Sequence, residues 1–355
     1  MSFYELMQMG ASSIKPLIKK TDDAKLKKKY ITALIVKNFL CILFCMLVVT
    51  TFTNLFGVNN SITGVVTVVL LMSVRFVDLD FKTSQSTFAL LAIFAIFIIS
   101  PYVVTLVNPV LGFFINFISM MTIIVLSCHN VMYCNQSTFI LSYLLLYGYQ
   151  VNSVSEYINR VFGLVLGGLL VAGIFYYKHR KIEFKNSFSD IIKDIDLSTP
   201  LTKWQLKLAL GVAIAILIGE LLHLPRIMWI AFACNSILQP TEEKVAERVK
   251  FRYPFVIIGC LIFAAVYLVV PEAYRGYIGM FGGLMVGFSG TYNWQTSFNC
   301  FGALAVAVPM FGLGWAIVIR IADNIIAAIY SKLFNNIFNK IEGRICNKET
   351  ISEMG

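Results

Sequence analysis

The stretch YINRVFGLVLGG (residues 157–168) places an arginine, Arg160, at the head of an otherwise apolar segment. The stretch VIRIADNIIAAI (residues 318–329) repeats this pattern with Arg320, 160 positions further along the chain. Charged side chains are costly to place in lipid, so the recurrence of an arginine in this setting is informative. We interpret the two stretches as copies of one ancestral feature.

Composition indicates the medium in which these stretches lie. Hydrophobic residues make up 58% of the 355 residues and charged residues 14%, and the mean hydropathy is +0.77. Soluble domains contain about 45–50% apolar and about 25% charged residues. Long apolar runs recur along the chain, and because a helix needs roughly 20 residues to cross a bilayer, there is room for about ten to twelve helices. The sequence therefore predicts an all-α membrane protein.

We expect about twelve transmembrane helices. The predicted spans are 31–56, 61–76, 84–106, 109–128, 136–150, 156–177, 204–223, 226–239, 254–271, 274–290, 295–310 and 312–335. Those that begin at 61, 136, 226, 274 and 295 are short for a full crossing, so each is either tilted, broken or re-entrant.

Lysine and arginine predict the orientation of the chain. They cluster in the first 30 residues, in every second connection between spans and in the tail. The other connections contain almost no lysine or arginine. Under the positive-inside rule the basic segments and both termini are cytoplasmic. The net charge of +10 then reflects sidedness and not nucleic-acid binding. The first 30 residues lack the apolar core of a cleavable signal peptide.

A second pair of matching stretches supports the repeat. YCNQSTF (residues 133–139) matches YNWQTSF (residues 292–298), and the apolar run that begins at Lys37 matches the one that begins at Lys207. Each copy follows a cytoplasmic lysine-rich segment, so each contains an even number of crossings, most simply six. We predict two parallel six-helix repeats, with a shared pathway at their interface. The expected divisions are a basic lead-in (1–30), the first repeat (31–177), a cytoplasmic linker (178–203), the second repeat (204–338) and a cytoplasmic tail (339–355).

The chain resembles the fusaric acid resistance and aromatic acid exporter superfamily. The resemblance rests on the six-helix halves, the tryptophan-bearing second helix LPRIMWIAFACNSILQPT (residues 224–241) and the last helix headed by Arg320, and it covers about residues 30–338. Two features depart from the pattern: the linker 178–203 is too short for the large cytoplasmic domain of familiar members, and the first copy lacks the Pro-Thr pair found at Pro240. The chain is most similar to the compact members of the superfamily.

The resemblance implies an inner-membrane secondary transporter of bacteria that exports organic anions, aromatic carboxylic acids above all, with proton coupling. It also implies a membrane-fusion adaptor protein as a partner. An organic-anion channel, like the more distant malate channels of plants, and a non-transporting membrane scaffold are the alternatives. Small-residue helix faces favour a homo-oligomer.

Two arginines and two acidic residues are the ionisable candidates for a pathway. Arg320 and Asp323 are one helical turn apart, so their side chains can meet on one face of the helix. Either the two charges only neutralise each other, or Arg320 binds the anion and Asp323 carries the coupled proton. Arg160 has Gly163 in place of that acid, so it either faces the pathway unpaired or extends to the outer interface. Glu220 lies between apolar residues and either titrates there or pairs in the headgroup layer. Glu156 lies at a span boundary.

Polar side chains mark the predicted inner mouth of the fifth helix in each copy. They are Asn135 and Gln136 in the first copy and Trp294 and Gln295 in the second. Such side chains either hold helices together or line a pathway with neutral hydrogen-bond donors.

Other functions find little support. The sequence contains no Walker loop, HExxH motif, nucleophile elbow or paired catalytic carboxylates, so we predict neither an enzyme nor an ATP-driven pump. The eight cysteines are scattered and form no CxxC motif. Cys128, His129 and Cys134 have no recognised metal-site spacing, so we predict no metal and no cofactor.

Overall fold

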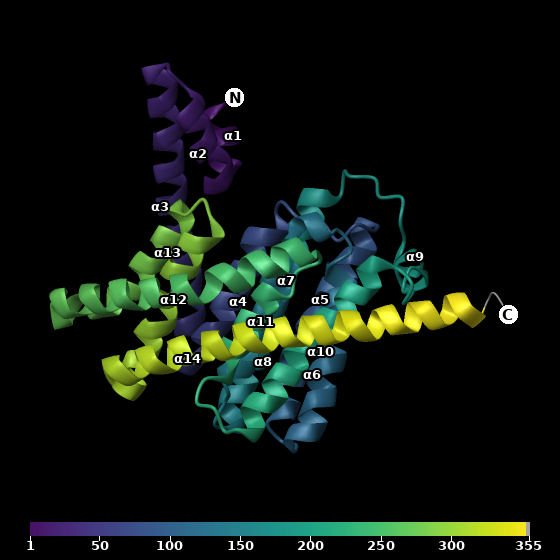
Figure 1. Cartoon of the computed structure of the whole chain (residues 1–355). Coiled ribbons are helices and arrows are strands. Elements are labelled where there is room, and N and C mark those ends of the chain that lie inside the picture. Colours follow the sequence, from purple (N-terminus) through teal and green to yellow (C-terminus); the bar gives the residue numbers. More distant parts are fainter. Residues whose placement is uncertain (353–355) are drawn as a thin grey trace. The chain divides into compact units, whose positions relative to one another are not determined.

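Helices make up most of the described chain. The structure, a computed structural model, describes the backbone of residues 1–352 and the side chains of residues 1–344. Helix accounts for 83% of the chain, and residues 1–352 contain no strand (Figure 1). The predicted all-α class is confirmed.

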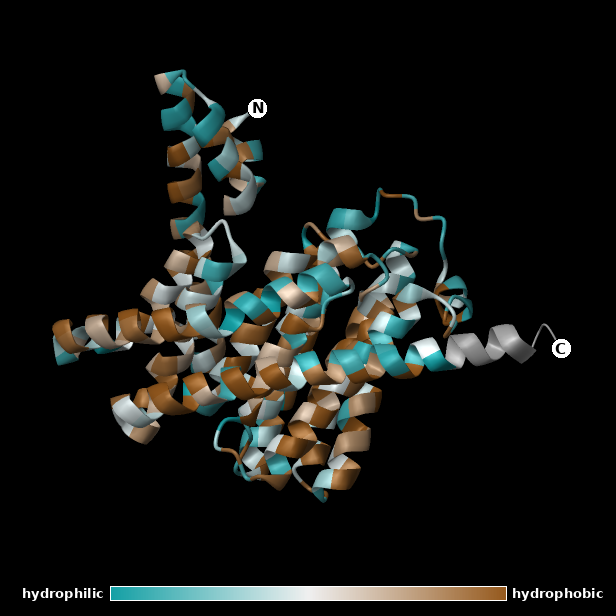
Figure 2. Ribbon diagram, viewed as in Figure 1, coloured by the Kyte–Doolittle hydropathy of each residue, from teal (hydrophilic) through white to brown (hydrophobic). Residues whose placement is uncertain are grey.

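Within the described residues, seven helices are long and apolar enough to cross a membrane. They are α3 (Ala24–Phe56), α5 (Thr83–Val104), α6 (Pro109–Ser127), α8 (Val154–His179), α10 (Pro200–Leu221), α12 (Glu242–Val269) and α14 (Tyr292–Ser352). Hydrophobic residues predominate along much of these helices, and hydrophilic residues gather in the N-terminal segment, around α9 (Phe188–Lys193), at the start of α12 and toward the end of α14 (Figure 2). The chain is therefore a multi-pass membrane protein.

Four apolar helices are too short for a full crossing. They are α4 (Ser61–Val74), α7 (Gln136–Gly148), α11 (Ile227–Ile237) and α13 (Ile278–Phe288), each with 11 to 14 residues. They lie at four of the five spans expected to be short. The fifth is the first part of α14, which is interrupted at Gly312, where a φ of 75° favours glycine. The number of crossings and the repeat layout stay predictions.

The helices form two compact units. The first unit comprises Met1–Leu47 and Lys250–Ile325. Its N-terminal part contains two short helices, α1 (Phe3–Gln8) and α2 (Ala11–Lys20), which pack Leu6 and Ile14 into a small cluster with α3. The predicted lead-in is therefore a folded segment.

The second unit comprises Val48–Val249 and the chain from Ile326 onward. In it α10 packs on α6 and α11, α5 packs on α6 and α8, and α4 packs on α7 and α8. The short helix α7 contacts both α4 and α11. The large buried side chains Phe97, Phe139, Tyr143 and Phe175 form the core between these helices.

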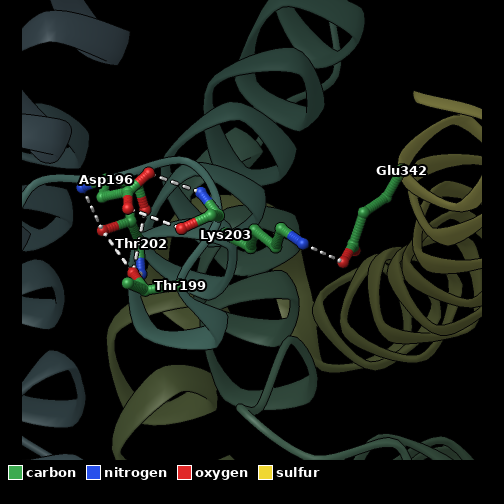
Figure 3. Close-up of polar contacts among 6 residues, drawn as sticks. Asp196, Thr199, Thr202, Lys203 and Glu342 are labelled. Atoms are coloured by element: carbon green, nitrogen blue, oxygen red, sulfur yellow. Dashed lines mark hydrogen bonds and ion pairs between the residues drawn. The ribbon is translucent and has the colours of Figure 1, made fainter. Parts of the chain in front are cut away.

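Polar contacts join α10 to the last part of α14. Lys203 Nζ lies 3.0 Å from a carboxylate oxygen of Glu342, next to the capped first turn of α10 (Figure 3). One turn along α10, Lys207 is buried and donates to Asn335 Oδ1 at 2.9 Å and to Glu242 Oε1 at 3.3 Å. Lys207 thus lies in a network that joins three helices.

Glycines allow α8 to approach α4 closely. A Cβ atom added at Gly163 would lie 2.8 Å from Thr63 Oγ1, and one added at Gly167 would lie 2.1 Å from Thr67 Oγ1. The two pairs are one helical turn apart, so they form a continuous contact between the helices. Gly163 and Gly167 are therefore packing residues between α4 and α8.

We expect Gly167→Val to destabilise the second unit by about 1–3 kcal/mol, because the added side chain overlaps Thr67 in a packed interface. Gly173→Val is the matched control, since a Cβ there meets nothing within 4 Å on the same helix. Gel filtration of heated, detergent-solubilised protein measures the effect. Equal losses of folded protein in the two variants would show that the α4–α8 contact tolerates bulk.

Candidate functional site

Buried charged side chains meet in the first unit. Arg320 and Asp323 lie one turn apart on α14, with 5% and 3% of their surface exposed, and Arg252 of α12 is also buried. Asn324, next to Asp323, has no exposed surface. These four residues form the charged cluster.

Hydrogen bonds hold Arg252 in the charged cluster. Its Nε donates to Asn324 Oδ1 at 3.0 Å, and its Nη1 donates to the hydroxyl of Tyr292 at 3.1 Å. Asn324 in turn donates through Nδ2 to the carbonyl oxygen of Arg320 at 2.8 Å. Asn324 therefore links the side chain of Arg252 to the backbone of α14 at Arg320.

The helices that carry the cluster are in close contact. A Cβ atom added at Gly259 of α12 would lie 2.3 Å from the carbonyl oxygen of Ser297 on α14. The hydroxyl of Ser297 donates to the carbonyl oxygen of Phe255 at 2.7 Å. This contact fixes α12 against the first part of α14 about one to two turns from Arg252.

The charged cluster carries excess positive charge. Two guanidinium groups and one carboxylate leave one positive charge when all are ionised. Arg320 interacts with the Asp323 carboxylate and with the Cys300 thiol, whereas Asp323 Oδ2 accepts no hydrogen bond from the described residues. The net positive charge of the cluster would attract an anion that enters it.

The structure places Gln295 and Trp294 at the start of α14. Gln295 is half-buried and donates to the carbonyl oxygen of Ser289 at 3.2 Å, while Trp294 is exposed over 46% of its surface. The ring of Trp294 lies 6.0 Å from that of Phe255 and 5.9 Å from that of Phe298. Trp294 is thus part of an aromatic row on α12 and α14.

Arg160 lies in a network of loop carbonyl groups in the second unit. It is buried, and it donates through Nε to Asn60 Oδ1 at 3.1 Å, through Nη2 to the carbonyl oxygen of Asn59 at 3.2 Å and through Nη1 to that of Tyr149. Asn60 Nδ2 donates to the carbonyl oxygen of Glu156 at 3.0 Å. Arg160 therefore ties two connections to the first turns of α8, and the predicted contact with an anion stays a prediction.

Glu220 pairs with a tyrosine. The hydroxyl of Tyr147 on α7 donates to Glu220 Oε1 at 2.5 Å, and the carboxylate lies beside Gly112 of α6. The side chain is half-buried at the end of α10. Glu220 thus connects α7 with α10, and its pathway role is untested.

Three buried amides form a second polar site, the amide cluster, which consists of Asn135, Gln136 and Asn235. Their side chains are 1–4% exposed. Asn235 Nδ2 of α11 donates to the carbonyl oxygen of Gln136 at 3.1 Å, and Asn135 Nδ2 donates to that of Ser127 at 2.6 Å. Within residues 1–344, both polar atoms of the Gln136 side chain and the Oδ1 atoms of Asn135 and Asn235 have no hydrogen-bond partner. These atoms can bind a polar solute or water.

Sequence reasoning missed Arg252, Asn324 and Asn235. Arg252 belongs to the basic stretch EEKVAERVKFR, which predicted only a cytoplasmic connection. The signal that could have found it is its position directly before the apolar run from residue 254. Asn324 and Asn235 are isolated amides in apolar helices, and such residues in lipid need a partner.

A comparison with protein-family models gives a match to part of the chain. Residues 214–334 match the family model of fusaric acid resistance protein-like proteins, over about a third of the chain. The matched region includes Arg252, Arg320, Asp323 and Asn235. Searches of curated proteins and of solved structures found no match. The predicted resemblance is confirmed over these residues.

Proposed function

We propose, from the match of residues 214–334 to the fusaric acid resistance family, that this transporter-like membrane protein is a secondary transporter that exports organic anions. The observation that carries the proposal is the charged cluster. Two buried arginines and one buried acid lie in the cluster, so it attracts a negative solute within helices that are apolar enough to lie in lipid.

Aromatic side chains beside the cluster favour aromatic carboxylates among the organic anions. Successive rings of Phe255, Trp294, Phe298 and Phe301 are 5.8–6.0 Å apart along α12 and α14. Ring pairs at about 4.5–7 Å attract each other, so the ring of an aromatic acid can join this row while its carboxylate binds an arginine.

Asp323 supports proton coupling. It is buried, and one of its carboxylate oxygens accepts no hydrogen bond from the residues with described side chains. A carboxyl group in this setting can exchange a proton when an anion arrives at Arg320 or leaves it, because the two charges interact.

The amide cluster supports a second place where the anion binds. Among the atoms without a partner in the described residues, Gln136 Nε2 is the donor, and it can donate to a carboxylate without carrying charge. Asn135 and Gln136 lie in the first predicted copy and Asn235 in the second. The remaining expectations, a bacterial inner-membrane location, an adaptor partner and a homo-oligomer, rest on the resemblance and on small-residue packing.

Purified protein in liposomes tests the proposed function. We expect 4-hydroxybenzoate loaded at pH 7.5 to leave these liposomes faster than protein-free ones, and acidification of the outside to accelerate its exit, because protons enter as anions leave. The amine analogue 4-hydroxybenzylamine, a cation at this pH, should leave at the protein-free rate.

Three results would count against the proposal. Equal efflux from protein-free liposomes would show that the protein does not transport 4-hydroxybenzoate. Efflux of the amine as fast as that of the acid would show that transport does not select anions. Anion currents across a planar bilayer that persist without a proton gradient would show that the protein is a channel and not a proton-coupled transporter.

A further inference from the structure

A cavity of about 750 Å³ opens between α5, α6 and the linker that follows α8. Its walls are almost entirely apolar and include Phe88 and Ala92 of α5 and Phe188, Ile192 and Ile195 of the linker. Small-molecule pockets span about 300–1,000 Å³, so the cavity is large enough for a substantial ligand. None of these residues belongs to the charged cluster or the amide cluster.

The linker wall of the cavity is fixed to α5. The linker contains the short helix α9 (Phe188–Lys193). The backbone N–H of Lys82 donates to the carbonyl oxygen of Asn186 at 3.0 Å, and that of Phe188 donates to Gln85 Oε1 at 2.8 Å. Ile191 is buried against the helices. Hydrogen bonds and a buried side chain therefore hold the linker wall of the cavity in place.

The mouth of the cavity presents apolar side chains outward. Phe88 is exposed over 73% of its surface, Ile192 over 46% and Ile195 over 41%. Phe88 lies on α5, which is long and apolar enough to cross a membrane, so hydrocarbon is the natural medium on this side. An aliphatic occupant fits these walls.

Two lysines stand beside the mouth. Asp190 of α9 accepts hydrogen bonds from the hydroxyl and the backbone N–H of Ser187 at 2.7 and 2.8 Å, which hold the pKa of its carboxyl below the usual value. Lys82 and Lys193 both lie within electrostatic reach of Asp190, and both are exposed. The carboxylate is already stabilised by its own cap, so the lysines can bind a further anion.

We propose that this cavity binds an acyl chain of an anionic phospholipid, whose phosphate lies against Lys82 and Lys193. An apolar chain and a phosphate group joined in one molecule match an apolar cavity with basic residues at its mouth. The bound lipid would hold α9 against α5 and α6. The inference does not depend on transport activity.

Native mass spectrometry of the purified full-length chain tests the site by titration with phosphatidylglycerol and phosphatidylcholine. Ala92→Phe fills the cavity from an exposed position, and Ala95→Phe, also exposed on α5 but outside the lining, is its matched control. We expect Ala92→Phe to raise the dissociation constant of the first lipid about tenfold, the effect of leaving roughly two methylene groups outside. Ile195→Asn on the exposed linker is a second cavity variant in case Ala92→Phe does not fold.

The charges are tested separately. We expect the wild-type protein to prefer phosphatidylglycerol, and Lys82→Gln and Lys193→Gln each to reduce that preference about fivefold. The exposed Lys181→Gln should leave it unchanged. Equal binding of the two lipids by the wild type, or equal effects of Ala92→Phe and Ala95→Phe, would overturn the proposal.

Discussion

Arg320→Gln should reduce efflux of 4-hydroxybenzoate by about 10-fold to 100-fold, because a buried hydrogen bond to a charged group contributes about 1.5–3 kcal/mol. Glutamine retains a polar end group but is shorter and neutral, so the loss reflects the missing guanidinium group. Efflux from liposomes that contain equal amounts of folded protein measures it. Lys340→Gln, an exposed cation on the same helix, is the matched control and should transport as the wild type does.

A double variant separates the two interpretations of Arg320. If Arg320 serves only to neutralise Asp323, then Arg320→Gln with Asp323→Asn removes both charges and should restore transport together with folding. If Arg320 receives the anion, the double variant should fold well and still fail to exchange 4-hydroxybenzoate across the liposome membrane, a reaction that needs no net movement of the proton assigned to Asp323. Restored efflux in the double variant would therefore contradict the proposed role.

Hydropathy predicted the helices of this chain well, because each long apolar run needs internally satisfied backbone groups in lipid. The short spans at α4, α7, α11 and α13 and the interruption at Gly312 lie where the pattern placed them. The pattern could not show how these helices pack, since packing depends on which faces meet.

Charge counting could not place Arg252. It assigns basic residues beside a span to water, yet α12 begins at Glu242 and carries Arg252 into contact with Asn324. The partners of Arg160 were equally out of reach, because Asn59 and Asn60 precede it by about 100 residues. An arginine buried in a membrane helix can either bind a solute or hold loops in place through hydrogen bonds. Only the acceptors that surround the arginine in the structure distinguish these two roles.

Arg160→Ala should lower the stability of the second unit by about 3 kcal/mol or more, because three oxygen atoms lose their donor at once. These are the side-chain oxygen of Asn60 and the carbonyl oxygens of Asn59 and Tyr149. Each buried acceptor left without a partner costs about 1–3 kcal/mol. In a heating series in detergent, followed by gel filtration, the midpoint should fall on the order of 5–10 °C.

Two further variants show whether Arg160 stabilises the loops or binds the anion. Lys178→Ala removes an exposed cation from the same helix and should leave the midpoint unchanged. Arg160→Lys retains the charge but has one nitrogen in place of the guanidinium fork, so it should restore little stability. If Arg160→Ala melts with the wild-type midpoint and yet loses efflux of 4-hydroxybenzoate, Arg160 contacts the anion and the loop network around it is incidental. If Arg160→Ala melts at a lower temperature but its folded fraction transports normally, the two arginines of the repeated pattern have different roles. Arg320 then binds the solute, and Arg160 stabilises the fold.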